Sequence, residues 1–146
     1  MNIGTEILRR SPTLVSAVPV LCGALVPALA ADLPAFRKGM WEFTRSVDTQ
    51  GQSKPVTLTN RKCTEPSADM KNIQALLAKQ GCKLSPATAK GNQYTFSSEC
   101  TVKGEAMSSR SVITVESDSA YKVEVSSKGG GRFTKELLVA RRVGAC

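Results

Sequence analysis

The chain of 146 residues contains no histidine. This absence excludes Ser-His-Asp and Cys-His catalysis, the commonest proton shuttle near neutral pH and most zinc chemistry. Aromatic residues are also scarce, at 5% of the sequence. No basic segment is interleaved with aromatic side chains, an arrangement that single-strand nucleic-acid binders use for stacking. We therefore expect no nucleic acid among the partners.

Carboxylates are the side chains left that could act as an acid and a base, as they do in glycosidases. The candidates all fit strand positions whose side chains face water: Glu42, Glu99, Glu105, Glu116 and Glu124. A carboxylate-based hydrolase is therefore the least favoured function. The sequence predicts a protein that is not an enzyme, with no catalytic residue and no cofactor.

The glycine run Gly129–Gly131, between Lys128 and Arg132, superficially suggests a phosphate cradle. A Walker loop needs the pattern G-x-x-x-x-G-K-[ST] at the start of a helix. Here a strand pattern follows, so the run predicts a hairpin turn.

The N-terminus has a basic lead, Arg9-Arg10, followed by an uncharged apolar run to residue 31. Ala28-Leu29-Ala30 fits the small-x-small pattern of a cleavage site. This order is typical of a secretory signal peptide, so we predict cleavage after residue 30. The alternative is an uncleaved membrane anchor, which is disfavoured because two prolines interrupt a run barely long enough to span a bilayer.

Cleavage would leave one exported domain, residues 31–146, in the periplasm or outside the cell. Its 116 residues suffice for one modest core. The removed segment holds two of the 20 basic and one of the 12 acidic residues, so the net charge falls from +8 to +7. Such an excess predicts affinity for an anionic envelope polymer, a lipid headgroup or an acidic protein.

Four cysteines fall within the predicted domain: Cys63, Cys82, Cys100 and Cys146. An even number in a small exported chain predicts disulfides, with three possible connectivities. A four-cysteine zinc site is disfavoured because no two cysteines have the C-x₂₋₄-C spacing. No metal site is predicted.

The stretch from Cys82 to Cys100 is centred on Gly91. A hairpin with a three-residue turn at Lys90-Gly91-Asn92 places the two cysteines opposite each other and pairs Lys83 with Glu99. This geometry favours a Cys82–Cys100 bond and leaves Cys63–Cys146 as the second. The competing two-residue turn at Gly91-Asn92 would oppose Cys82 to Thr101, so we expect the three-residue turn and the disulfide to occur together.

The remaining chain alternates in the manner of strands, with one helical segment. A strand from Gly39 and a return strand over 56–62 come first, and a helix near Pro66 stops at Gly81. Strands are also predicted over 112–116, 121–126 and 133–143. The residues expected to face the interior include Met70, Ile73, Leu76 and Leu77 of the helix and Leu137, Val139 and Val143 of the last strand. Residues 31–38 are expected to be loosely held.

These segments predict a mainly β fold. It is an antiparallel, curved sheet or partial barrel of about seven strands, with one helix packed across it.

Two dibasic pairs, Arg61-Lys62 and Arg141-Arg142, fall near the ends of predicted strands. A Cys63–Cys146 bond would bring them together as a binding surface for an anionic partner. The alternative is solvated charge that keeps the protein soluble.

Several short motifs resemble a bacterial family, the domain-of-unknown-function family numbered 3617. They are G-M-W at 39–41, C-T-E-P at 63–66, Cys82 with Gly91 and Cys100, and R-R-V-G-A-C at 141–146. The resemblance implies an exported location and a β-rich fold. It implies no activity, cofactor or catalytic residue.

Together these features favour a non-enzymatic binding or interaction protein for an anionic envelope component or partner. The alternative is a carrier of a small apolar ligand in the curved sheet, since small barrels and curved sheets can enclose ligands.

Overall fold

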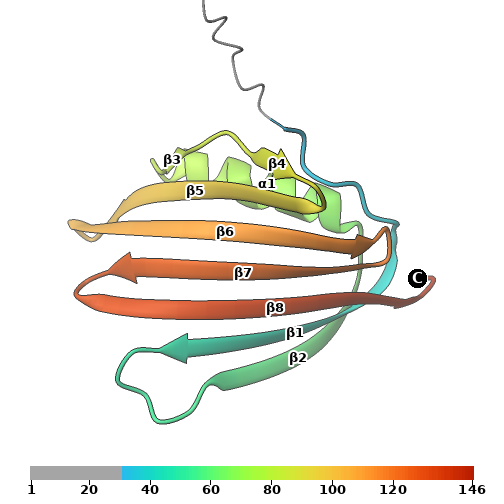
Figure 1. Cartoon of the computed structure of the whole chain (residues 1–146), viewed down its shortest axis with the longest axis horizontal. Coiled ribbons are helices and arrows are strands. Elements are labelled where there is room, and N and C mark those ends of the chain that lie inside the picture. Colours follow the sequence, from blue (N-terminus) through green and yellow to red (C-terminus); the bar gives the residue numbers. More distant parts are fainter. Residues whose placement is uncertain (1–30) are drawn as a thin grey trace, which may run out of the picture.

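The computed structural model describes residues 31–146, and the predicted signal peptide, residues 1–30, lies outside the described residues. The described chain forms one helix and eight strands (Figure 1). Their bounds are β1 (Gly39–Thr49), β2 (Val56–Thr64), α1 (Pro66–Lys79), β3 (Lys83–Leu84), β4 (Thr88–Lys90), β5 (Gln93–Val102), β6 (Glu105–Ser117), β7 (Ala120–Gly129) and β8 (Arg132–Gly144). Within residues 31–146, no helix combines the length and apolar character needed to cross a bilayer.

The strands form a single antiparallel sheet in the order β2-β1-β8-β7-β6-β5-β3, and β4 also pairs with β5 (Figure 1). The sheet is open, because β2 and β3 form its two edges and do not pair with each other. Helix α1 lies on one face, behind β5 in the view of Figure 1. The predicted mainly antiparallel β fold with one helix is confirmed. The eighth strand arises because the first arm of the cysteine hairpin is divided into β3 and β4.

Helix α1 begins at Pro66, whose missing N–H would have no partner in the first turn. Thr64, two residues before the helix, is the last residue of β2. Its hydroxyl donates a hydrogen bond to the Asp69 carboxylate over 2.7 Å. At the other end, Gly81 has a φ of 82°, the left-handed conformation predicted for the stop of the helix.

The hairpin between Cys82 and Cys100 contains two registers. Near the disulfide, Lys83 is paired with Glu99, as predicted. Near the turn, Thr88 is paired with Thr95, one residue out of step with that register. The residues between β3 and β4 absorb the difference, much as a β-bulge does.

The hairpin turn is therefore shorter than predicted. Lys90 pairs with Gln93 and leaves Gly91-Asn92 as a two-residue turn. Gly91 has a φ of 60°, which a type II′ turn requires at its first position. The hypothesis that the three-residue turn and the disulfide must occur together is wrong, because a single irregularity between them separates the two registers.

Strand β8 presents the opposite face from the one predicted. Register pairs Ala140 with both Phe43 and Tyr121, which places Ala140 and Leu138 on the α1 side of the sheet. The residues predicted to face inward lie on the other side: Leu137, Val139 and Val143. The parity of a strand is set by its neighbours, and β8 has apolar residues on both parities.

Five buried side chains form the core at one end of the sheet: Phe36, Trp41, Ile113, Tyr121 and Ala140. The ring of Phe36 stacks on Tyr121 with centroids 4.4 Å apart, and it lies nearly perpendicular to the ring of Trp41, with centroids 6.0 Å apart. These aromatic contacts close this end of the α1 side of the sheet.

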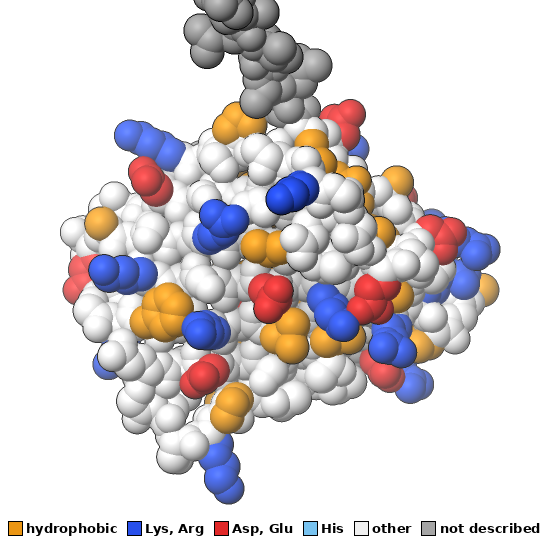
Figure 2. Space-filling model, viewed as in Figure 1, with side chains coloured by type: hydrophobic (Ala, Val, Ile, Leu, Met, Phe, Trp, Pro, Cys, Tyr) orange, Lys and Arg blue, Asp and Glu red, His pale blue; other side chains and the backbone are white. Residues whose placement is uncertain are grey.

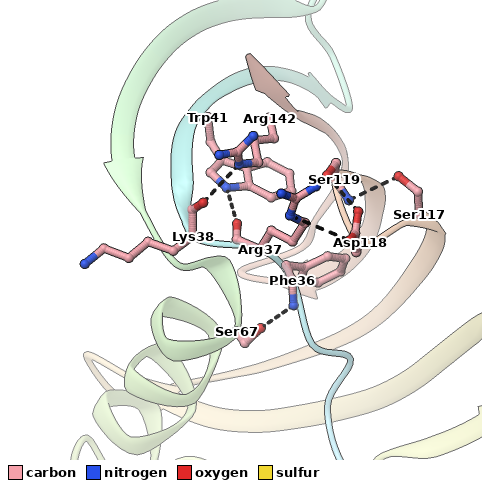
Figure 3. Close-up of polar contacts among 9 residues, drawn as sticks. All are labelled: Phe36, Arg37, Lys38, Trp41, Ser67, Ser117, Asp118, Ser119 and Arg142. Atoms are coloured by element: carbon pink, nitrogen blue, oxygen red, sulfur yellow. Dashed lines mark hydrogen bonds and ion pairs between the residues drawn. The ribbon is translucent and has the colours of Figure 1, made fainter. Parts of the chain in front are cut away.

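Residues 31–38, which we call the N-terminal strap, are held by hydrogen bonds at both ends rather than loosely held. Figure 3 shows the contacts of Phe36, Arg37 and Lys38. The Phe36 amide donates to the Ser67 hydroxyl over 2.8 Å, which ties the strap to the first turn of α1. The Lys38 carbonyl accepts a hydrogen bond of 2.9 Å from Arg142 Nε of β8. Burial of Phe36 explains the difference from the prediction, because a single aromatic anchor fixes an otherwise irregular segment.

Candidate functional site

A groove of about 960 Å³ lies between α1 and the sheet. The core fills only one end of this space, so the helix does not pack down along the full length of the strands. Leu33 of residues 31–38 lines the groove and packs against the core. Two other hollows in residues 31–146 are smaller, at about 490 and 290 Å³.

The roof of the groove is the sheet-facing side of α1, contributed by Met70, Ile73, Gln74 and Leu77. The predicted stripe is therefore only partly correct, because Leu76 faces away and Gln74 takes a place on the inner side. Ile73 remains 58% exposed even though it lines the groove, and Leu76 is 55% exposed. A helix pressed against its sheet would bury such a residue, so the exposure of Ile73 reflects the open space beneath it.

The floor near the core is an apolar row that crosses neighbouring strands. Register pairs Ile113 with Val123, and Val123 with Leu138. All three side chains line the groove. Paired residues lie on the same face of a sheet, so these side chains form one continuous apolar strip under α1.

A row of hydroxyl groups crosses the same strands farther from the core. Ser98 is paired with Ser109, and Ser109 with Ser127, and all three line the groove. The Ser98 and Ser109 hydroxyls are 2.7 Å apart and share a hydrogen bond. This hydroxyl row lies four residues along each strand from the apolar row, or about 13 Å at strand spacing.

The outer end of the groove lies at the β5–β6 turn. Val102, Lys103 and Met107 line it, and all three are exposed. The disulfide between Cys82 and Cys100 also borders the groove and ties the chain just after α1 to β5. The groove is therefore closed by the core at one end and limited by a covalent link near the other.

One ion pair crosses the floor. Arg45 donates to both carboxylate oxygens of Glu136, over 2.6 and 2.7 Å. The hydrogen bonds that Arg45 donates to Glu136 raise the pKa of Arg45 despite partial desolvation. Glu136 is not among the candidates predicted from the sequence, because the expected inward face of β8 had the wrong parity. Knowing that Ala140 packs on Phe43 would have placed Glu136, four residues earlier, on the groove side.

A second carboxylate lies at the groove beside the start of α1. Desolvation acts to raise the pKa of Asp69, but hydrogen bonds from Thr64 and Lys62 outweigh it and leave this pKa below its usual value. Lys62 Nζ lies 3.0 Å from the Asp69 carboxylate. The charges of both groove-lining carboxylates, Asp69 and Glu136, are therefore matched by neighbouring cations.

The four basic residues predicted to bind an anionic partner lie near one end of the sheet but on two faces. Arg61 and Arg141 both pair in register with Glu42, on the face away from α1. Lys62 and Arg142 have the opposite parity and point to the α1 side.

Most of these basic side chains have partners within the protein. Arg61 lies 2.7 Å from Glu42, Lys62 binds Asp69, and Arg142 donates to the strap. A common anionic partner for the four residues stays a prediction.

Both predicted disulfides are present in the structure. Cys82 is bonded to Cys100, and Cys63 to Cys146. The second bond joins the end of β2 to the end of the chain, with 5.5 Å between the Cα atoms. Within residues 31–146, no group of three or more His, Cys, Asp or Glu side chains is arranged to hold a metal ion.

The face of the sheet away from α1 has a mixed surface. Figure 2 shows hydrophobic side chains separated by charged side chains of both signs. Phe133, Leu137 and Val143 are 39 to 48% exposed. Two of the glutamates considered as catalytic candidates, Glu42 and Glu99, belong to this face and pair in register with Arg61 and Lys83. The groove on the α1 side is therefore the stronger candidate site.

Residues 36–146 match the family described as "Protein of unknown function (DUF3617)". The chain belongs to this family. One motif of the resemblance to DUF3617 begins at Gly39. A Cβ added at Gly39 would clash with the Arg142 side chain and the Gly144 carbonyl. The G-M-W and R-R-V-G-A-C motifs of this DUF3617 member are therefore adjacent in space. Searches of curated proteins and of solved structures each found no significant match.

Proposed function

We propose that this protein is a non-enzymatic carrier that binds a small apolar ligand in the groove between α1 and the sheet. The observation that supports the proposal is a groove of about 960 Å³ whose roof and inner floor consist mainly of apolar side chains. Ligand sites typically have volumes of about 300 to 1,000 Å³, largely apolar walls and a few polar groups.

The small core supports the same proposal. Only six hydrophobic residues in the described part of the chain are buried, and they include the small side chains Ala87 and Ala140. Ile113 is fully covered, whereas Val123 and Leu138 in the same row are only partly buried. Apolar surface removed from water contributes about 25 cal/mol per Å². A ligand that covers this strip therefore adds burial that the protein alone lacks.

The two disulfides support a location in an oxidising compartment, because such bonds persist there and are rare in the cytosol. We therefore propose that the carrier acts in the periplasm or outside the cell. The net charge of +7 for residues 31–146 supports a second interaction, with an anionic envelope component.

A matched pair of helix variants tests the groove. Ile73→Gln and Leu76→Gln change residues with 58% and 55% exposure on the same helix, but only Ile73 lines the groove. Binding of the neutral, polarity-sensitive dye Nile red is measured by fluorescence titration. Ile73→Gln should weaken binding about fivefold, because loss of roughly half a buried aliphatic side chain costs about 1 kcal/mol.

Leu76→Gln should bind the dye like the unmodified protein, and circular dichroism checks that both variants retain the fold. Equal dye affinities for the two variants would refute the groove as the binding site. Native mass spectrometry of protein purified from its own host should also show a bound small molecule, and a clean protein mass would count against the carrier function.

A further inference from the structure

We propose that the ligand of the groove is a single-chain amphiphile with an anionic head group. Its hydrocarbon chain covers the apolar row, and its head group lies in the outer half of the groove, between the hydroxyl row and Lys103. This inference rests on the proposed carrier function and specifies the ligand of the same site.

The floor changes character along the strands. The apolar row contains Ile113, Val123 and Leu138 and crosses β6, β7 and β8. The hydroxyl row contains Ser98, Ser109 and Ser127 and crosses β5, β6 and β7. A purely apolar ligand would leave the three hydroxyl groups against hydrocarbon, and burial of hydroxyls without full hydrogen bonding is unfavourable. A ligand with one apolar and one polar end matches both rows.

The hydroxyl row has hydrogen-bonding capacity to spare. Ser98 and Ser109 use one hydrogen bond between themselves. Each serine hydroxyl has one donor and two acceptor positions, so the pair can still bind a polar head group. Ser127 lies beside Ser109 on the next strand and extends the row toward β8.

Charge distinguishes the kind of head group. Four charged residues line the groove: Arg45, Asp69, Lys103 and Glu136. Arg45 is paired with Glu136, and Asp69 with Lys62. Among these lining residues in the described chain, Lys103 is the one without an ion-pair partner. The uncompensated charge of the groove is therefore positive and favours an anion.

Lys103 is also placed where a head group would enter. It lies in the exposed turn between β5 and β6, with a φ of 51°, an uncommon backbone conformation for a residue other than glycine. Its flexible stem carries a point charge with three donors. An ammonium at the rim can meet a carboxylate or a phosphate while the chain of the ligand extends under α1.

The test compares two probes that differ only at the head, dodecanoate and dodecanol, each kept below the concentration at which it aggregates. Each is titrated against the complex of the protein with Nile red, at low salt. Dodecanoate should displace the dye about fivefold more effectively than dodecanol, the effect expected for one exposed ion pair. Lys103→Gln should abolish this preference without changing the affinity for dodecanol.

Lys54→Gln is the matched control, because it removes the same charge from an exposed loop residue that does not line the groove. It should retain the preference for dodecanoate. A loss of preference equal to that of Lys103→Gln would overturn the inference, because overall charge would then explain it.

The outcomes for the inference and for the carrier function are distinguishable. Equal displacement by the two probes, with both weakened by Ile73→Gln, would overturn the anionic head group and leave the carrier function intact. Failure of both probes to displace the dye, with no effect of Ile73→Gln, would overturn both proposals.

Discussion

The two disulfides are expected to affect stability and ligand binding in opposite order. In one variant Cys82 and Cys100 are both replaced by alanine, and in the other Cys63 and Cys146 are. The first bond ties the end of α1 to β5 beside the groove, whereas the second joins the end of β2 to the end of the chain. The paired substitutions leave no free thiol from the broken bond.

The magnitudes follow from the loops that the bonds close. The Cys82–Cys100 bond has a sequence separation of 18 residues, and the Cys63–Cys146 bond one of 83. In the chain-entropy model these loops correspond to about 3 and about 4.5 kcal/mol of the free energy of unfolding. A single domain has only about 5 to 15 kcal/mol in total, so each loss is a large fraction.

Urea denaturation at pH 7 measures the first half of the prediction. With a slope of about 1.5 kcal/mol per M, the midpoints should fall by about 2 M without Cys82–Cys100 and about 3 M without Cys63–Cys146. Nile red titration in the absence of urea measures the second half. Removal of Cys82–Cys100 should weaken dye binding more, because the end of α1 is then tied to the sheet only through the two residues of β3.

Equal midpoints for the unmodified protein and either variant would show that the bonds do not restrict the unfolded chain as this reasoning requires. Dye binding that is weakened more by loss of Cys63–Cys146 would show that the roof of the groove does not depend on the bond beside it.

Two further predictions concern pH. Burial, with a smaller contribution from the charge of Asp69, raises the pKa of Tyr121 to about 12. Folding therefore favours the neutral form of Tyr121. This contribution to the free energy of unfolding is fully present below pH 10, and about 2 to 3 kcal/mol of it is lost as the pH rises toward 12. Tyr121→Phe should remove this part of the alkaline loss in urea denaturation, whereas Tyr94→Phe, at a half-buried position, should not; a decline unchanged by Tyr121→Phe would contradict the assignment. The pKa of Asp69 is lowered, so its contribution is present above pH 4 and is lost as the pH falls through the lowered pKa. Asp69→Asn should therefore lower the melting temperature at pH 7 and have less effect at pH 2.5, and an equal effect at both pH values would contradict the ion pair with Lys62.

Local alternation predicted most of the sheet because several strands have apolar residues on a single parity. In β7, Tyr121, Val123 and Val125 alternate with polar residues, and the structure places all three on the α1 side. The disulfide end of the cysteine hairpin was predictable for a related reason, since the opposite charges of Lys83 and Glu99 mark its register. Gly91 marks the turn, although the turn is one residue shorter than predicted. Both signals lie within about 20 residues of sequence.

The same method failed where a strand carries apolar residues on both parities. In β8, Leu137, Leu138 and Val139 are consecutive, so the pattern does not determine which of them faces inward. Pairing with β1 and β7 decides the question, and that pairing is non-local. The first half of β6 was not predicted, because it is rich in serine and has no alternation of apolar and polar residues. It forms a strand because it pairs with β5 on one side and β7 on the other.

The groove could not be predicted from the sequence, because each of its rows joins residues of different strands rather than residues of one strand. Ser98, Ser109 and Ser127 are separated by 11 and 18 residues in the chain, and each alone resembles an ordinary polar strand position. Only the register of β5, β6 and β7 aligns them. The sequence therefore allowed a ligand carrier to be named as an alternative function, but it did not identify the residues that would line the ligand site.

The structure also explains why a helix with a weak apolar stripe is sufficient here. The closed end of the groove is fixed by Phe36, which packs on Tyr121 and is bound through its amide to Ser67 of α1. The other end of the helix is fixed by the covalent bond after Gly81. Attachment at both ends holds α1 over the sheet without close packing along its middle, where Ile73 remains more than half exposed. Stability then comes from the core and the disulfides, and the groove between them is not filled by side chains.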